Sequence, residues 1–167
     1  MKNIMKGQIR NLFTDHQQTM KFGLWMSGYE DEGEWKEWYY NGQLYIRCFY
    51  KDGKQNGEGE KWNKDGQLKE HYFYKNGKLE GEYKYWFSDG RLKEHCFYKN
   101  NERNGEYKRW YQNGKLNLHC FYNNGNLYGE YEEFDENGEM HIHCFMRNYG
   151  KYSIEDAKKL FPEGPWL

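Results

Sequence analysis

One stretch of 24 residues, repeated five times without a gap, constrains the fold of this chain more than any other feature. The third copy reads GEYKYWFSDGRLKEHCFYKNNERN. The five copies begin at Gly33, Gly57, Gly81, Gly105 and Gly129. Self-similarity at a fixed period of this length is the signature of a repeat architecture. The sequence therefore predicts an array of equivalent units, each packing mainly on its neighbours.

Each repeat contains two turn signals. The first is Asn-Gly or Asp-Gly, as at Asn113-Gly114, and the second is similar, as at Asn124-Gly125, with Asn100-Asn101 as a variant. These dipeptides favour two-residue type I′ hairpins, in which both central residues have positive φ. We predict two strands of about ten residues per repeat, joined in chain order into an antiparallel meander of roughly 12–14 strands.

The repeats divide the chain into three consecutive parts of one continuous domain. Residues 1–32 supply N-terminal strands, residues 33–152 are the five repeats, and residues 153–167 form a C-terminal helix and tail. Ser153 with Asp156 three residues later is a capping-box pattern at the start of that helix. The predicted fold is all-β: an elongated single-layer antiparallel β-meander of tandem hairpin repeats with a short C-terminal capping helix.

Hairpins with even-numbered loops sort the side chains onto two faces, because alternate residues of a strand point to opposite sides. Tyr107 falls opposite Cys120 on one side, which we name the Tyr/Leu/Cys face. Lys108 falls opposite His119 on the other side, which we name the cationic face. Over residues 33–128 the cationic face carries a formal charge of +6 and the Tyr/Leu/Cys face +1.

Two further placements follow from two-residue turns. Trp110 falls opposite Asn117, and both lie on the cationic face. A turn at Ser27-Gly28 places Met20 and Phe22 on the Tyr/Leu/Cys face, in agreement with the register of the repeats.

Cysteine and histidine recur at fixed repeat positions. The cysteines are Cys48, Cys96, Cys120 and Cys144, with Tyr72 in the second copy, and the histidines are His71, His95, His119 and His143. Equivalent residues lie two strands apart, roughly 9–10 Å, which is too far for a disulfide. We predict buried thiols in a reducing compartment, half-exposed histidines that contribute at most a pH-sensitive anion contact, and neither metal nor cofactor.

The cationic face is the candidate nucleic-acid-binding surface. Basic side chains interleaved with aromatic ones suit a phosphate backbone, although packing and solvation along a sheet produce the same pattern. The residues expected to bind are Lys36, Arg47, Lys69, Lys84, Arg91, Lys93, Lys108, Lys115, Trp38, Trp62, Trp86, Trp110, His95 and His119.

The sequence contains no catalytic motif. Ser-His-Asp sets, phosphate loops and paired buried carboxylates are missing, and a residue present in every repeat is more often structural than catalytic. The N-terminal MKNIMKGQIRNLF lacks the apolar run of a secretory signal, and no segment approaches 18 apolar residues. We expect a non-enzymatic protein without a membrane span, intracellular and cytoplasmic, in the host cell if the protein is viral.

Several segments resemble MORN repeats. Tyr74-Lys-Asn-Gly-Lys-Leu-Glu-Gly-Glu-Tyr83 and Gly105-Glu-Tyr107 are most similar to the variant class found in bacteria and in viruses of amoebae, some members of which are labelled antitoxins. The resemblance covers about 33–152. The His-Gly of the animal type is replaced here by Asn56-Gly57, Glu80-Gly81, Asn104-Gly105 and Tyr128-Gly129. The resemblance implies an elongated, twisted meander used for scaffolding, with lipid or protein contact in some members and no single activity.

Two functions remain open at this stage. The first is binding of nucleic acid, with the backbone of duplex DNA as the ligand of the cationic face. The alternative is a protein–protein interaction scaffold or an antitoxin-like module. A homodimer through the Tyr/Leu/Cys face is a further prediction, because one layer of sheet leaves that face partly uncovered.

Overall fold

The computed structural model describes residues 19–23, 32–147 and 150–163, which form twelve strands and one helix in two units, Met1–Leu79 and Glu80–Leu167. The first unit contains β1 (Thr19–Gly23), β2 (Gly33–Tyr39), β3 (Leu44–Lys51), β4 (Lys54–Trp62) and β5 (Leu68–Lys75). β6 (Lys78–Trp86) begins at the boundary. The second unit continues with β7 (Leu92–Lys99), β8 (Glu102–Trp110), β9 (Leu116–Asn123), β10 (Asn126–Phe134), β11 (Met140–Arg147), β12 (Gly150–Tyr152) and α1 (Ile154–Leu160).

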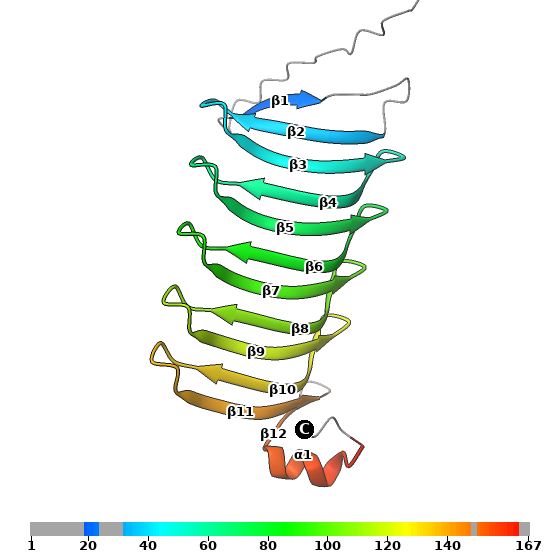
Figure 1. The fold of residues 1–167 in the computed structure, drawn as a ribbon. Helices are drawn as coiled ribbons and strands as arrows, with labels where there is room; N and C mark the ends of the chain where they lie inside the picture. The colour runs from blue at the N-terminus through cyan, green and yellow to red at the C-terminus, as the bar shows by residue number, and fades with distance from the viewer. Residues whose placement is uncertain (1–18, 24–31, 148–149, 164–167) are drawn as a thin grey trace, which may run out of the picture. The chain divides into compact units, whose positions relative to one another are not determined.

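In each unit the strands pair antiparallel with their neighbours in the chain, so the predicted meander is confirmed (Figure 1). The second turn of each of the first four repeats has the predicted type. Asn124 and Gly125 both have positive φ (47° and 79°), and Asn123 pairs directly with Asn126. Asn100 and Asn101 adopt the same geometry without a glycine, at φ 52° and 73°. Asparagine tolerates this region better than most residues do.

The first turn of each repeat differs from the prediction. The Tyr111 N–H donates to the Lys115 carbonyl and the Gly114 N–H donates to the Tyr111 carbonyl, both at 2.9 Å. Gly114 has φ +87°, whereas Asn113 is not left-handed. This is a three-residue loop with its glycine in the left-handed position, a common alternative to the two-residue type I′ turn.

A β-bulge compensates for the odd length of this loop. Trp110 lies opposite Leu116 and Arg109 opposite Leu118, which leaves Asn117 as an extra residue. The same shift occurs between β2 and β3, β4 and β5, β6 and β7, and β10 and β11. The predicted pairing of Trp110 with Asn117 is therefore wrong.

Beyond the bulge the predicted register is confirmed. Tyr107 lies opposite Cys120 and Lys108 opposite His119. A three-residue loop plus one bulged residue moves the register by the same amount as a two-residue loop. The assignment of these side chains to the two faces was therefore predicted correctly, although the predicted turn was wrong.

The register of β1 does not agree with the prediction. Met20 lies opposite Trp38 and Phe22 opposite Lys36, which are positions of the cationic face instead of the Tyr/Leu/Cys face. The connection from β1 to β2 spans residues 24–32, so a two-residue turn at Ser27-Gly28 does not set the pairing. Residues 24–31, like residues 1–18, lie outside the part of the chain that the structure describes.

The core of the second unit lies on the Tyr/Leu/Cys face. Cys96, Tyr107 and Cys120 are buried, and the partly buried residues packed against them are Tyr83, Tyr98, Leu118, Tyr122, Leu127 and Tyr131. All four cysteines are free thiols, as predicted, and only 1–3% exposed. Burial raises the pKa of the Cys96 and Cys120 thiols to about 12, so the reactive thiolate form is disfavoured.

The second repeat exchanges a large and a small residue across one strand pair. Other repeats place Tyr or Trp opposite Cys, as in Tyr83 opposite Cys96, whereas here Gly59 lies opposite Tyr72. A Cβ atom at Gly59 would lie 2.1 Å from the Tyr72 ring. The Tyr72 ring therefore occupies the space that residue 59 would need for a side chain.

A glycine in the even-numbered strands produces a second irregularity. Leu127 lies opposite Tyr122 but Tyr131 opposite Cys120, so three residues of β10 face one residue of β9. Gly129, in the middle of the three, has φ +93°. The even-numbered strands β4, β6, β8 and β10 curve just after the hairpin that precedes each of them (Figure 1). Because this shift is two residues, the parity of the faces is preserved.

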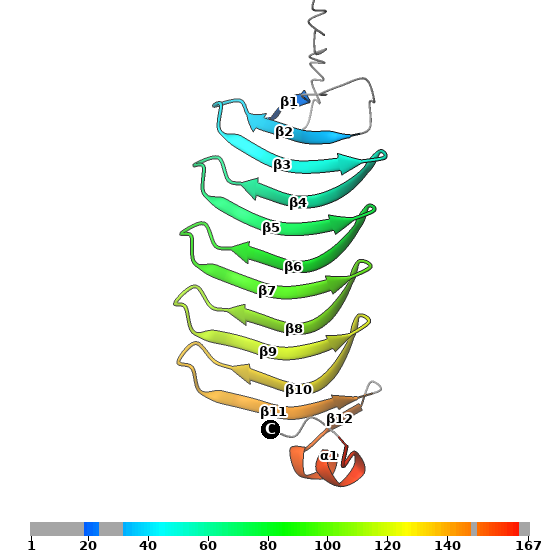
Figure 2. The same ribbon diagram turned by 45° about the vertical axis from the view of Figure 1, so that its right-hand side comes forward.

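The array ends where this glycine is replaced. Ser153 occupies the repeat position of Gly129 but has φ −62°, and its side chain accepts a hydrogen bond from the Asp156 N–H as the N-cap of α1. Ala157, in the middle of α1, is fully buried. α1 lies beside β12 at the end of the second unit (Figure 2). The predicted N-cap at Ser153 is confirmed, with the Asp156 carboxylate accepting a hydrogen bond from the Ser153 hydroxyl at 2.7 Å, and a helix follows where a further repeat would continue as a strand.

The Gly59–Tyr72 exchange predicts a strong coupling between the two positions. Gly59→Tyr alone overpacks the site and should destabilise the protein by about 1–3 kcal/mol. Tyr72→Cys alone leaves a cavity and should cost roughly 3 kcal/mol. The double variant recreates the Tyr–Cys pair of the other repeats and should lie within about 1 kcal/mol of the wild type. Urea unfolding followed by circular dichroism measures all four proteins, and simple additivity of the two losses would contradict the exchange.

The glycines at the second irregularity, such as Gly105, predict a loss of stability on substitution that comes from the backbone and not from packing. Gly105 has φ +109°, and a Cβ there would only reach ordinary contact, 3.6 Å from Phe97 Cβ. Gly105→Ala should therefore cost about 1–2 kcal/mol through the backbone alone. Asn101→Gly, at φ 73° in the adjacent hairpin, is the matched control and should be neutral or slightly stabilising. Equal losses in both variants would show that positive φ is not the cause.

Candidate functional site

The cationic face carries a carboxylate beside each lysine of its central row. The pairs lie two residues apart on one strand, so both side chains project from the same side. Their N–O distances are 2.7 Å for Lys36–Glu34, 2.8 Å for Lys84–Glu82 and 2.7 Å for Lys108–Glu106. Within each unit these three predicted lysines therefore lie on the cationic face, but each is already in an ion pair.

His71, His95, His119 and Arg47 contact carboxylates of the neighbouring strands, either in the row of Glu58, Glu82 and Glu106 or at the repeat position of the lysines, as Glu60 and Glu132 do. The distances are 2.6 Å for His71–Glu58, 2.9 Å for His95–Glu82, 3.1 Å for His119–Glu106, 2.9 Å for His119–Glu132 and 2.7 Å for Arg47–Glu60. Glu82 and Glu106 each join a lysine of their own strand to a histidine of the next. The result is a lattice of alternating charge within each unit.

These contacts shift the titration of the carboxylates. The Lys108 ammonium donates a hydrogen bond that holds the pKa of Glu106 below its ordinary value of 4.5, against the opposing effect of partial burial, and His119 adds to the lowering. Lys84 and His95 act on Glu82 in the same way. Both carboxylates therefore stay ionised and continue to offset the lysines at neutral pH.

Phenylalanine rings flank the histidines on this face. The ring centroids are 5.1 Å apart for His95–Phe97, 5.2 Å for His119–Phe121 and 6.0 Å for His71–Phe73. Phe73 is 42% exposed, and Phe97 and Phe121 are partly exposed. The face thus combines paired charges with apolar rings that solvent reaches.

Lys93 does not belong to the cationic face. Its ammonium lies 5.3 Å from the ring centroids of Tyr85 and Phe87, which occupy the Tyr/Leu/Cys side of β6 and its turn. Lys93 holds the bulge position that Asn117 holds in the next repeat, where the Arg109 Nε donates to the Asn117 side chain at 2.6 Å. The bulge turns this residue to the other face, and Lys69 is the bulge residue of the second repeat.

The cations predicted near the hairpins hold adjacent hairpins together. Arg91 Nη1 donates to the Gln112 carbonyl at 2.6 Å and its Nε lies 3.3 Å from an Asp89 oxygen. Lys115 Nζ donates to the Asn137 carbonyl at 2.6 Å. These contacts give both side chains a structural role.

The predicted tryptophans lie at or next to the ends of their strands. They are Trp38, Trp62, Trp86 and Trp110, and all four are partly buried. Alternation along β8 puts Trp110 on the same side as Lys108, as predicted. The Trp62 carbonyl also accepts a hydrogen bond from the Tyr39 hydroxyl at 2.9 Å, which joins one hairpin to the next.

The candidate site residues predicted from the sequence did not include the row of carboxylates. Glu34, Glu58, Glu82 and Glu106 recur at one repeat position, and they form ion pairs with the selected cations Lys36, Arg47, Lys84 and Lys108 in turn. For the three lysines the signal was present in the sequence as Glu-x-Lys, because residues two apart on a strand share a face. Summing charges over a face did not reveal that they neutralise each other in pairs.

Within residues 32–147 and 150–163, no three or more His, Cys, Asp or Glu side chains gather as a metal site would require. Nor does any helix in the described part of the chain have the length and apolarity to cross a membrane.

The lowered pKa values predict a pH-dependent contribution to stability. A carboxylate with a lower pKa in the folded state stabilises the fold above its unfolded pKa and loses this contribution as the pH falls through the folded value. At pH 7 the double variant Glu82→Gln/Glu106→Gln should be less stable than the wild type by roughly 1 kcal/mol or less, because the pairs are partly solvated. The difference should shrink as the pH is lowered from about 5 to about 3.

Urea unfolding at a series of pH values measures this difference. Glu136→Gln, an exposed hairpin carboxylate, is the control and should follow the wild type throughout. A wild-type advantage that stays constant down to pH 3 would contradict the assigned ion pairs.

Comparison with known proteins agrees with this geometry. A family model described as "MORN repeat variant" matches residues 31–52, 55–76, 79–100, 103–124 and 127–148, which is most of the chain. A search of curated proteins finds no match. The five matched segments coincide with the five repeated hairpins. The chain therefore belongs to the MORN-repeat family, in its variant class.

Proposed function

We propose that this protein is a non-catalytic module that binds another protein through the cationic face of its repeats. MORN repeats often mediate interactions and are generally non-catalytic. The observation that carries the proposal is the pairing of cations with carboxylates in register, at 2.7–2.8 Å for the three Lys–Glu pairs.

A polyanion needs cations that can replace its counterions. On this face Lys36, Lys84 and Lys108 each have a carboxylate two residues away on the same strand. A phosphate that approached one of these lysines would also approach that carboxylate, and the repulsion would offset much of the attraction. Because Lys93 lies on the Tyr/Leu/Cys face, the cationic face has one positive charge fewer than predicted.

A protein surface suits the same lattice better. Alternating charges with partly exposed rings between them offer both ionic and apolar contacts, and the apolar contacts supply most of the energy in protein interfaces. The charge pattern sets register and partner choice. Nucleic-acid binding, the function predicted first from the sequence, is the alternative that the experiment below decides.

Self-association through the Tyr/Leu/Cys face is less well supported. The four cysteines of that face are 1–3% exposed, and in the second unit tyrosine and leucine side chains cover them. The cysteines are therefore covered within the chain, and a dimer contact would be made by the partly buried tyrosine and leucine side chains above them. Sedimentation equilibrium at high concentration tests this directly.

Swapping the members of the ion pairs separates the two functions. The variant Glu82→Lys/Lys84→Glu/Glu106→Lys/Lys108→Glu keeps every charge and reverses only their order. Capture of a protein partner should fall at least about tenfold, since like charges then meet across the interface. Binding to a phosphate backbone depends on the number of cations and should change little.

The control is Lys99→Glu/Glu102→Lys, which swaps an exposed cross-strand pair at a hairpin and should leave partner capture unchanged. Partner capture is quantified by affinity purification, and DNA binding by electrophoretic shift from about 50 to 300 mM salt. A duplex-DNA affinity that falls steeply with salt and survives the swap would replace the proposed function with nucleic-acid binding.

A further inference from the structure

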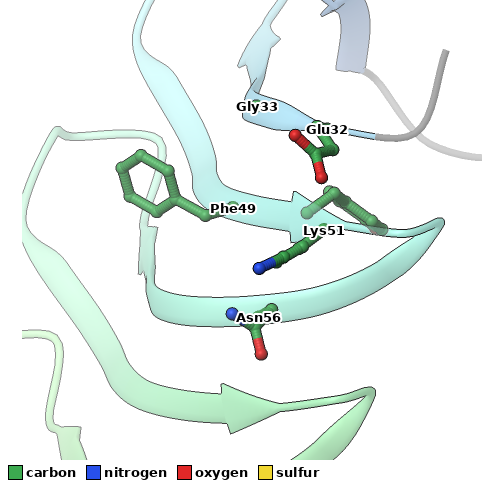
Figure 3. Close-up of a pocket in the computed structure, with 6 residues that line it drawn as sticks. Glu32, Gly33, Phe49, Lys51 and Asn56 are labelled. Carbon is green, nitrogen blue, oxygen red and sulfur yellow. The ribbon is translucent and has the colours of Figure 1, made fainter. Parts of the chain in front are cut away.

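An open hollow of about 490 Å³ lies on the surface of the first unit (Figure 3). It is lined by Glu32, Gly33, Phe49, Tyr50, Lys51 and Asn56, from β2, β3, β4 and the residue before β2. Its volume lies within the range of roughly 300–1,000 Å³ typical of ligand sites. Phe49 supplies an aromatic wall, and Lys51 supplies a cation beside it.

The repeat provides an occupied counterpart of this hollow in the second unit. Advancing each lining residue by four repeats gives Tyr128, Gly129, Phe145, Met146, Arg147 and Tyr152. The glycine and the phenylalanine are the same, and lysine is replaced by arginine.

At the counterpart, an aromatic side chain is bound by the protein itself. The Phe161 ring, which follows α1, has its centroid 6.1 Å from that of Phe145 and 5.4 Å from that of Tyr152. The Arg147 guanidinium lies 4.3 Å from the Phe161 centroid, in cation–π range. Phe145 is 0% exposed there, the most buried of the large side chains.

We infer that the hollow in the first unit receives an aromatic side chain of a partner protein, carried at the C-terminal end of a short amphipathic helix. The inference rests on the proposed function and names the partner's chemistry. Phe49 takes the role of Phe145 as the ring beside the guest, and Lys51 takes the role of Arg147 as the cation over it.

The differences between the two sites define the guest more closely. Glu32 and Asn56 stand where the counterpart has Tyr128 and Tyr152, so the hollow replaces two rings by a carboxylate and an amide. Asn56 Oδ1 accepts from the Asn76 N–H, which leaves its amide nitrogen as the group to donate (Figure 3). A tyrosine, which carries a hydroxyl that can both donate and accept, fits this site better than phenylalanine.

Charge complementarity points to the same kind of helix. The last turn of α1 is basic, with Lys158 and Lys159. A partner helix with a similar basic last turn would bring its cations near Glu32. Basic residues at a helix C-terminus are also favoured by the helix dipole, so the motif is intrinsically stable.

A peptide with residues 150–163 of this chain tests the inference against the full-length ¹⁵N-labelled protein. Three versions are used: the native peptide, Phe161→Tyr and Phe161→Ala. The native and tyrosine peptides should cause saturable amide shifts at Phe49, Tyr50 and Lys51, with the tyrosine version the tighter. The alanine peptide should bind at least about fivefold more weakly, since one aromatic anchor supplies most of the contact.

Variants of the protein identify the site. Lys51→Ala should weaken the tyrosine peptide about two- to fivefold, as expected for loss of one cation–π contact at an exposed site. Lys54→Ala, an exposed lysine directly across the same hairpin, is the control and should bind like the wild type. Both lysines are exposed, and the dispersion of the amide spectrum reports whether each variant is folded.

The inference is overturned if the tyrosine peptide leaves Phe49 and Lys51 unshifted, if the alanine peptide binds equally well, or if Lys51→Ala has no effect. Contacts between Phe49 and the chain's own residues 24–31 in the free protein would overturn it too. If one of these results is found while the ion-pair swap still reduces partner capture, only this inference is wrong. If the ion-pair swap also leaves partner capture unchanged, the proposed function is wrong as well.

Discussion

The pleat of the sheet allows each repeat only an even shift in register, and every other feature of the protein depends on this constraint. Each turn and each irregularity in the repeat keeps the shift in register even. The three-residue loop at Gly114 is odd, but the bulge at Asn117 adds one residue. The type I′ turn at Asn124-Gly125 is even, and the irregularity around Gly129 shifts the pairing by two. Within each unit, the cysteines therefore stay on one face, and the histidines and the carboxylates that they contact stay on the other.

Packing on the buried face is local, as the repetition requires. Cys96 and Cys120 pack mainly against tyrosines of adjacent strands, so a change at one position can be compensated at the position opposite. Gly59 and Tyr72 are such a case, with a tyrosine ring filling the space of the missing side chain. The end of the array follows the same logic. Ser153 replaces the glycine that would have continued the sheet, and a helix forms instead.

On the open face, the spacing of charges matters more than their sum. A formal excess of cations led from the sequence to a nucleic-acid hypothesis. In the structure Lys84 and Lys108 are paired with carboxylates of their own strands, and Lys93 contacts rings of the other face. The aromatic hollow beside Phe49 and its occupied counterpart at Phe145 add a specific contact point to a surface otherwise made of paired charges.

The sequence alone determined the number of repeats, the meander, the capped helix and the parity of most side chains, because these depend on turn residues and on a period of two that local chemistry encodes. The tertiary structure decided which turn each repeat uses, since a three-residue loop with a bulge and a two-residue loop lead to the same register. It also decided the face of Lys93, the pairing of β1 with Met20 opposite Trp38, and the contacts of His95 with Glu82 and of His119 with Glu106. Those outcomes depend on atoms brought together from different strands, and no single stretch of sequence contains both partners with their geometry.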